Sequence, residues 1–307
     1  MSTEPLVSVI IPSYKNKEYI FDAVFSVLRQ ETDFEYEVIV VDSSGDDTAS
    51  LLRDRFPQIR VIELQQRAFP GTARNYGIRE AKGQFFSFTD ADCIVHRHWL
   101  KYLVESHRRG YAVVGGRVKN GTPWSLWGTI DYLLECSDLL KPFETTRNSH
   151  FGTGNLSLKR EIVQKYGMFI DQIKGSDSIY CRMLKKNGET LFHQPKALVW
   201  HRNRTRPSKI FKNQFELGYG AAFNRRKYQL KGKVFIDYPV LIVLLPFARL
   251  AAIGFRLLRY SPFDFLKFVL MTPLTFPILC YYAYGFVRGR ADVLKQDLYN
   301  AAKHDKG

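Results

Sequence analysis

Two carboxylates stand at the end of the apolar run in the segment FFSFTDADC: Asp90 and Asp92 flank the small residue Ala91. Such a pair, placed just beyond a predicted strand, can converge on one point. Hard oxygen ligands of this kind suit Mg²⁺ or Mn²⁺, which proteins usually share with substrate phosphates. The spacing therefore indicates a divalent cation site, although acidic pairs are also common in ordinary turns.

Two other apolar runs also end in groups that could contact a nucleotide. Pro12 and Tyr14 follow the first run, and Asp42 ends another. A carboxylate can accept an N–H from a base edge, and a tyrosine ring can lie against a base. Arg74 stands near the start of a predicted helix, within reach of a base or a phosphate. The sequence has neither a G-x-G-x-x-G after the first run nor a Walker lysine, which disfavours dinucleotide and P-loop sites.

An alternation of strand and helix patterns positions these groups. Apolar, β-branched runs predict strands, and apolar residues at helical spacing predict helices between them. The pattern predicts strands at 6–12, 36–41, 60–64 and 84–88, and helices at 18–30, 48–56 and 72–82. Strands that alternate with helices indicate a parallel sheet with crossover helices, whose ligands lie at the carboxyl ends of the strands.

Several motifs, in this order along the chain, resemble the family 2 (GT-A type) glycosyltransferases. The resemblance covers about residues 6–201 and is carried by VSVIIPSY, VIVVDSSGDDT, GTARNYGI, FFSFTDADC, FGTGNLSLKR and SDSIYCRMLKKNGE. It implies a GT-A Rossmann-like fold, with a mixed, mainly parallel sheet flanked by helices. It also implies an inverting glycosyltransferase that uses a nucleotide-sugar donor, together with Mn²⁺ or Mg²⁺.

The resemblance assigns roles to the donor-side residues. Pro12 and Tyr14 match positions beside the nucleotide base, and Asp42 matches a carboxylate that reads uracil-like N–H groups. Arg74 matches a nucleotide contact within the family's A-R-N-x-G stretch. The donor is therefore expected to be a UDP-sugar, with guanine and thymine as alternatives.

The metal and catalytic positions are assigned in the same way. Asp90, Ala91 and Asp92 match the metal-binding motif, with Asp92 expected to bind the ion directly. His201 resembles a histidine that some members place near the metal and pyrophosphate, although a structural role is an alternative. Asp177 matches the family's general base, and an N-cap is the alternative for a carboxylate at a helix start.

The acceptor side is less defined. Gly154 and Asn155 lie in a stretch where the backbone could approach a sugar, and Ser176 stands where the family usually has glutamate. The leading hypothesis is transfer to a lipid-linked or growing saccharide in the biosynthesis of cell-envelope polysaccharides. Direct transfer to a polyprenyl phosphate is an alternative, and a non-catalytic nucleotide-sugar-binding scaffold is an alternative of another class.

The positive charge is concentrated in the last third of the chain. The whole chain carries a net charge of +15, and from His201 onward there are 19 Lys and Arg against 6 Asp and Glu, a net of +13. A basic block can contact nucleic acid, an acidic ligand or a membrane surface. Apolar runs follow it, at 238–248 and at 268–287. They favour an anionic membrane surface as the partner and disfavour nucleic acid.

These patterns predict three regions. Residues 1–230 would form the catalytic domain, ending in a basic amphipathic segment at 202–233. Residues 234–290 would form an apolar helical hairpin that either spans the bilayer or lies in it, and 291–307 a polar tail. No basic residue precedes the first apolar run and no C-x-x-C pair occurs, so we expect no signal peptide and a reducing compartment. The expected location is the cytoplasmic face of the cell membrane, and the sequence does not indicate an oligomeric state.

Overall fold

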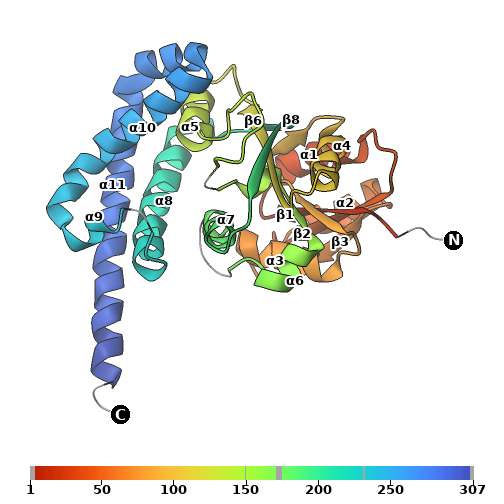
Figure 1. Ribbon diagram of the computed structural model, residues 1–307, viewed down its shortest axis with the longest axis horizontal. Coiled ribbons are helices and arrows are strands. Elements are labelled where there is room, and N and C mark those ends of the chain that lie inside the picture. The colour runs from red at the N-terminus through yellow and green to blue at the C-terminus, as the bar shows by residue number, and fades with distance from the viewer. Residues whose placement is uncertain (1–3, 149, 171–174, 231, 305–307) are drawn as a thin grey trace. The chain divides into compact units, whose positions relative to one another are not determined.

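The computed structural model describes residues 4–148, 150–170, 175–230 and 232–304, with side chains described as far as residue 295. The chain divides into two compact units. The sheet unit comprises Met1–Pro123 and Leu139–Asn203, and the helical unit comprises Trp124–Asp138 and Arg204–Gly307. Figure 1 shows the strands in the first unit and helices alone in the second.

An eight-stranded sheet, in the order β3-β2-β1-β4-β7-β6-β8-β5, forms the centre of the sheet unit. Parallel pairs join β1 to β2 and β4, β2 to β3, and β6 to β8. Antiparallel pairs join β7 to β4 and β6, and β5 to β8. The strands are β1 (Val7–Ser13), β2 (Tyr36–Asp42), β3 (Arg60–Glu63), β4 (Phe85–Phe88), β5 (Cys93–Val95), β6 (Val113–Asn120), β7 (Leu156–Lys159) and β8 (Leu191–His201).

Helices cover both faces of the sheet because successive strand side chains point to opposite sides. Val9 and Ile11 of β1 belong to the core formed with α1, α2 and α4. Between them, Ile10 faces α3, where Gly77 leaves no room for a Cβ against the Ile10 side chain. The elements of this unit are α1 (Lys17–Leu28), α2 (Thr48–Arg55), α3 (Pro70–Glu80), α4 (Trp99–Arg108), η1 (Thr153–Asn155), α6 (Arg160–Tyr166) and α7 (Ser176–Lys186).

The predicted mixed, mainly parallel α/β fold is confirmed. The strands expected at 6–12, 36–41, 60–64 and 84–88 correspond to β1 to β4, and the three expected helices correspond to α1, α2 and α3. These segments were predictable because buried parallel strands are apolar throughout and the helices carry an apolar face. The antiparallel insertion of β7 between β4 and β6 depends on pairing between distant segments, and no local pattern indicated it.

The helical unit consists of α5 (Leu126–Cys136), α8 (Pro207–Lys227), α9 (Val234–Asp237), η2 (Pro239–Leu244), α10 (Leu245–Tyr260) and α11 (Pro262–His304). The helices α8 and α11 pack backbone to backbone at glycines. A Cβ at Gly218 would collide with the Tyr282 carbonyl, and one at Gly285 would collide with the Phe215 carbonyl. Small residues at these positions let two helices approach closely.

Because of this packing, the boundary between the two units differs from the one expected from composition. The division falls between Asn203 and Arg204, not near residue 230, because the basic helix α8 packs along α11. The segment expected as a polar tail also continues α11 as far as His304. Two stretches, Pro239–Tyr260 and Pro262–Lys295, are long and apolar enough to cross a membrane, judged by length and composition alone.

Candidate functional site

The first part of the site lies where β1 and β2 end side by side. Their parallel register places Ser13 beside Asp42, so Tyr14 and Asp42 come to the same edge of the sheet, with Pro12 one position before Ser13. Asp42 is buried, and its carboxylate accepts hydrogen bonds from the Ser44 hydroxyl at 2.7 Å and the Ser44 backbone N–H at 3.2 Å. Each oxygen keeps a further lone pair, so the carboxylate can still accept an N–H from a ligand.

Arg67 extends this edge, although no motif indicated it. Its guanidinium carbon lies 4.8 Å from the centre of the Tyr14 ring and 5.6 Å from the centre of the Phe69 ring. A guanidinium between two aromatic rings is held by cation–π attraction and presents a flat, charged surface. The loop between β3 and α3 thereby adds a positive charge beside Tyr14.

Arg74 joins this edge to the acidic pair. It projects from the first turns of α3 and is 5% exposed, and its Nη2 donates to Asp90 Oδ1 at 2.5 Å. Its Nε is buried without a hydrogen-bond partner among the described residues. The buried hydroxyl of Ser13 also has no partner there. Two buried polar groups with unused hydrogen-bonding capacity at the ligand-binding edge fit a site that is completed by a bound polar molecule.

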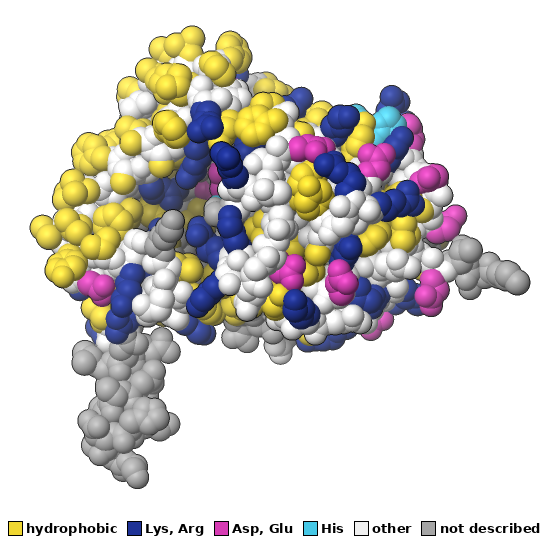
Figure 2. Space-filling view, in the orientation of Figure 1, with side chains coloured by type: hydrophobic (Ala, Val, Ile, Leu, Met, Phe, Trp, Pro, Cys, Tyr) yellow, Lys and Arg dark blue, Asp and Glu magenta, His cyan; other side chains and the backbone are white. Residues whose placement is uncertain are grey.

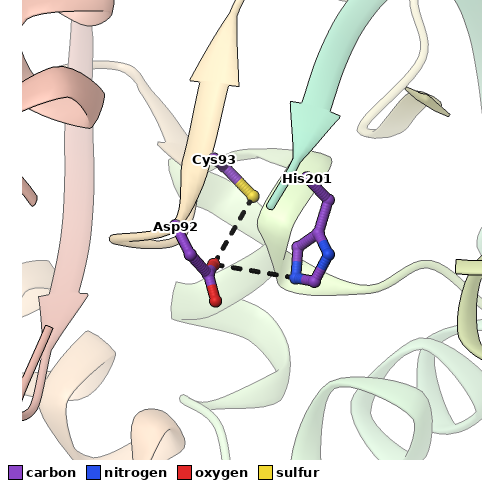
Figure 3. Close-up of side chains that lie close together, drawn as sticks. All are labelled: Asp92, Cys93 and His201. Carbon is purple, nitrogen blue, oxygen red and sulfur yellow. Dashed lines mark hydrogen bonds and ion pairs between the residues drawn. The ribbon is translucent and has the colours of Figure 1, made fainter. Parts of the chain in front are cut away.

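Asp92 and His201 form a second group of ionisable side chains, which the pairing of β5 with β8 brings together. The antiparallel register of β5 and β8 places Cys93 beside His201, which brings the His201 Nε2 to 3.6 Å from Asp92 Oδ1. The Cys93 Sγ lies 3.9 Å from the same oxygen, and one ligand atom from each of the three residues lies within 4.8 Å of the others (Figure 3). The His201 Nδ1 is hydrogen-bonded to Asn203 Oδ1 at 2.8 Å, which orients the ring.

These donors fit a divalent cation. A carboxylate and an imidazole held a few ångströms apart suit Mn²⁺, and the carboxylate alone suits Mg²⁺. The structure also separates the two aspartates of the motif, because Asp90 is paired with Arg74 while Asp92 faces His201. Ala91 between them is buried. Cys93 adds a sulfur donor that the acidic spacing alone did not suggest, although it directly follows Asp92 in the sequence.

The short helix η1 connects the acidic pair to Asp177. The Thr153 backbone N–H and hydroxyl lie 3.2 Å and 3.4 Å from Asp177 Oδ2 and donate to it. The next residue, Gly154, leaves room for Asp90, because a Cβ there would lie 3.0 Å from Asp90 Oδ2. The Gly154 carbonyl also accepts from the Thr89 hydroxyl at 3.2 Å. Two consecutive residues of η1 therefore contact the carboxylates of Asp177 and Asp90.

Asp177 itself is the second residue of α7, as the helical spacing after it predicted. Its Oδ1 accepts from the Ser178 backbone N–H at 2.7 Å, so the carboxylate also satisfies a helix-end donor. The N-cap alternative is wrong, because Gly175 is the N-cap of α7, and the second carboxylate oxygen of Asp177 faces Thr153.

Asn155 has a different environment from the one expected for an acceptor contact. It is buried, accepts from the Trp99 indole at 2.8 Å, and donates to the carbonyls of Arg117 and Ala197 at 3.0 Å and 2.9 Å. These bonds use both donors and one acceptor position of the amide. We therefore assign Asn155 to fixing η1 between β6 and β8 and do not include it among the acceptor contacts.

Ser176 is also enclosed. It is 4% exposed, and a Cβ on Gly71 would lie 2.8 Å from its hydroxyl oxygen. The start of α7 therefore packs closely on the start of α3, where Gly71 and Ser176 are both small. A glutamate at position 176 would need space that Gly71 and its neighbours occupy, which gives a physical reason for the serine.

Comparisons with known proteins identify the family. The family model described as "Glycosyl transferase family 2" matches residues 8–167. This chain belongs to that family. It is therefore a glycosyltransferase, and glycosyltransferase AglE of Haloferax volcanii is 30% identical to it over 229 residues, which are 71% of this chain and 74% of that protein.

Two solved structures show the same fold. One is the mannosyltransferase PcManGT of Pyrobaculum calidifontis, in complex with GDP-Man and Mn²⁺; its TM-score is 0.61 at 19% identity, covering 93% of this chain and 88% of that one. The other is residues 1–349 of TarS of Staphylococcus aureus in complex with UDP-GlcNAc; its TM-score is 0.51 at 17% identity, covering 94% and 92% of the two chains. These likenesses confirm the GT-A fold.

Proposed function

We propose that this glycosyltransferase moves a sugar from a nucleoside-diphosphate sugar to a saccharide acceptor by a single inverting displacement. The observation that carries the proposal is that consecutive residues of η1 meet the two carboxylates, since Gly154 lies against Asp90 and Thr153 donates to Asp177. A transferase needs its donor-binding groups and its base on either side of one reacting carbon. The arrangement meets this requirement with consecutive residues of a short helix.

Each residue at the sheet edge has a task in this proposal. Asp42 accepts an N–H from the base, with Tyr14 and Arg67 lying beside it and Pro12 shaping the end of β1. Arg74 holds Asp90 and uses its remaining N–H groups on the nucleotide. The two solved relatives of this fold were crystallised with GDP-Man and UDP-GlcNAc, so donors of both base types suit the fold. The Asp42 carboxylate favours uracil in this chain.

The cation is assigned to Asp92 and His201, with Asp90 close by. When bound there, a divalent ion supplies positive charge to a diphosphate leaving group. The presence of Mn²⁺ in the PcManGT complex supports this choice. The protein's own part is to keep Asp92 and His201 within reach of one another, which the β5–β8 pairing and the bond from His201 to Asn203 do.

Asp177 acts in this proposal as the general base. It takes the proton from the acceptor hydroxyl as that oxygen attacks the anomeric carbon from the face opposite the leaving group. The hydrogen bonds from Thr153 hold the Asp177 carboxylate toward η1 and restrict its rotation. An acceptor that is already an anion, such as a polyprenyl phosphate, would need no such base.

The acceptor class follows from the helical unit and from the relatives. TarS is named as a poly(ribitol-phosphate) beta-N-acetylglucosaminyltransferase, so a polymer is its acceptor. The two apolar stretches at Pro239–Tyr260 and Pro262–Lys295 support attachment to a membrane. We therefore propose a lipid-linked or growing envelope saccharide as the acceptor, met at the cytoplasmic face of the cell membrane.

Donor hydrolysis on the purified protein tests the proposal. UDP-, GDP- and dTDP-sugars are incubated with Mn²⁺, with Mg²⁺ and with EDTA, and nucleotide release is measured alongside binding by calorimetry. We expect one donor to be hydrolysed slowly in the presence of metal, and Asp92→Ala to reduce that rate by about a thousandfold. Asp33→Ala, an exposed carboxylate in a loop, is the matched control and should be unaffected. An absence of both binding and hydrolysis with every donor would contradict the proposal.

A further inference from the structure

Two of the three arginines of α10, Arg249 and Arg256, lie on its buried side, while its exposed side carries large apolar side chains. Arg249 and Arg256 lie on the face that also buries Ile253 and Leu257. The opposite face exposes Phe247 and other large apolar side chains to solvent. An amphipathic helix of a water-soluble domain has the reverse arrangement, with apolar residues inward and charges outward.

The inward arginines have defined partners within the helical unit. The Arg249 guanidinium carbon lies 3.7 Å from the centre of the Tyr282 ring, and its Nη2 lies 3.4 Å from Gln214 Oε1. Arg256 donates to the Ser137 hydroxyl at 3.1 Å. Charged groups that turn toward polar partners inside a helical bundle, leaving the outside apolar, are typical of helices surrounded by lipid.

The exposed apolar side chains form one continuous surface on η2, α10 and the first half of α11, which we call the apolar face. Figure 2 shows hydrophobic side chains gathered over these helices. Nine of its members are each more than half exposed, a degree of exposure that water makes costly. They are Val240 (76%), Val243 (67%), Leu244 (52%), Phe247 (56%), Phe255 (64%), Leu258 (54%), Phe263 (70%), Leu266 (57%) and Leu270 (74%).

The helix α8 limits how far this face can enter a bilayer. It lies along α11, with Phe211 packed on Tyr281 and the Tyr219 hydroxyl bonded to Asp292 at 3.0 Å. The outer side of α8 is charged and exposed, at Lys209, Lys212 and Glu216. Charges at these positions could not enter the hydrocarbon core without a large cost.

The part of α11 that α8 leaves uncovered is too short to cross a membrane. It runs from the turn at Ser261 to about Phe276, which at 1.5 Å per residue is roughly 22 Å, against about 30 Å for a hydrocarbon core. Arg259 and Lys267 flank the turn and would meet anionic headgroups favourably. Because this part is too short to reach the far headgroups, its basic flanks can meet only the near ones, and it would lie along one leaflet.

We infer that the helical unit is a one-leaflet membrane anchor that embeds the apolar face among lipid acyl chains without spanning the bilayer. This inference rests on the membrane attachment proposed above and specifies its surface and depth. The occupant is lipid, because Arg249 and Arg256 of α10 face inward and basic residues border the apolar face.

The first experiment tests the surface by flotation of the purified full chain with vesicles of phosphatidylcholine and phosphatidylglycerol. We expect flotation to persist in 1 M NaCl, since apolar burial is not screened by salt. Phe247→Asp combined with Leu270→Asp should lower the bound fraction at least tenfold, whereas Phe25→Asp, half-exposed in the sheet unit, should not change it. Circular dichroism checks that the double variant is folded. Failure to float, or loss of binding in salt alone, would overturn the inference.

The second experiment tests the depth. Cys280 is the exposed cysteine of the chain and is replaced by serine, leaving the buried Cys93, Cys136 and Cys181. Arg259→Cys, beside the turn, and Lys101→Cys, on α4 of the sheet unit, are then labelled with an impermeant maleimide on sealed vesicles to which the protein was added from outside. We expect both to be labelled equally. Labelling of the Arg259→Cys variant only after the vesicles are opened, or not at all, would contradict a one-leaflet anchor. Neither assay contains donor or acceptor, so their outcome is independent of glycosyl transfer.

Discussion

The two units differ in how many large apolar side chains they expose. In the described residues of the sheet unit, five large apolar side chains are exposed, against eighteen in the shorter helical unit. The sheet unit places its charges at a polar edge and its apolar residues in a closed core. In the helical unit Arg249 and Arg256 lie inside, while large apolar side chains of η2, α10 and α11 are exposed. We infer above that these side chains contact lipid, so we expect chemistry and attachment to respond to different substitutions.

Asp177→Asn should break the chemistry and leave the attachment intact. The amide keeps the shape of the side chain but cannot accept a proton, so we expect the rate of transfer to fall by roughly 10²–10⁴-fold. Flotation with vesicles should be unchanged. The measurement is the transfer rate at saturating donor, with Asp54→Asn on the exposed side of α2 as the control. Nearly normal transfer by the variant would indicate an acceptor that is already an anion, such as a polyprenyl phosphate.

Acid should weaken the sheet unit selectively. Burial lowers the pKa of His107 and of His193 to about 4, and both lie in that unit. Their unfolded pKa is near 6.5, so stability is fully present above that value and is lost as the pH falls toward 4. From pH 7 to pH 5 the loss should be about 2 kcal/mol for each histidine.

Urea unfolding followed by hydrogen exchange measures this loss for each unit separately. His107→Gln should be less stable at pH 7, because the bonds to Ser157 and the Tyr111 carbonyl are altered, but it should show a smaller dependence on pH. An equal loss of stability in both units, or an unchanged slope in the variant, would argue against this origin of the acid sensitivity.

Two glycines of the helical unit should respond oppositely to the same substitution. Gly285→Ala places a methyl group against the Phe215 carbonyl of α8, and we expect a loss of about 1–3 kcal/mol. Gly254→Ala on α10 meets no atom closer than 3.7 Å and should gain up to about 1 kcal/mol from helix propensity. Thermal unfolding in detergent micelles compares them. Equal effects of the two substitutions would show that α8 and α11 do not pack closely at Gly285.

The smallest effect is expected at Thr153. Thr153→Val removes the hydroxyl bond to Asp177 and keeps the backbone N–H bond, so the carboxylate should be less firmly oriented. We expect kcat to fall by about tenfold with KM for the donor unchanged, and the pH profile of kcat to shift. Thr32→Val, whose hydroxyl bonds only to the Phe34 carbonyl among the described contacts, is the control. A change in donor KM without a change in kcat would place Thr153 in donor binding instead.

The sequence by itself determined the family, the first four strands and their helices, and the residues at the strand ends. These features are local: a buried parallel strand is apolar throughout, and its polar end follows directly in the chain. The same locality makes Asp42, Asp90, Asp92 and Asp177 recognisable from the order of residues in the chain.

Only the tertiary structure decided which of these groups face each other. The pairing of β5 with β8 brings His201 to Asp92, and η1 contacts both Asp177 and Asp90, across separations in sequence that no local pattern encodes. The same holds for the domain boundary, which depends on glycine contacts between α8 and α11, and for the direction of Arg249. A composition profile counts charges and apolar residues along the chain. Whether each of these side chains faces the interior or the outside of the unit depends on the elements that pack against its helix.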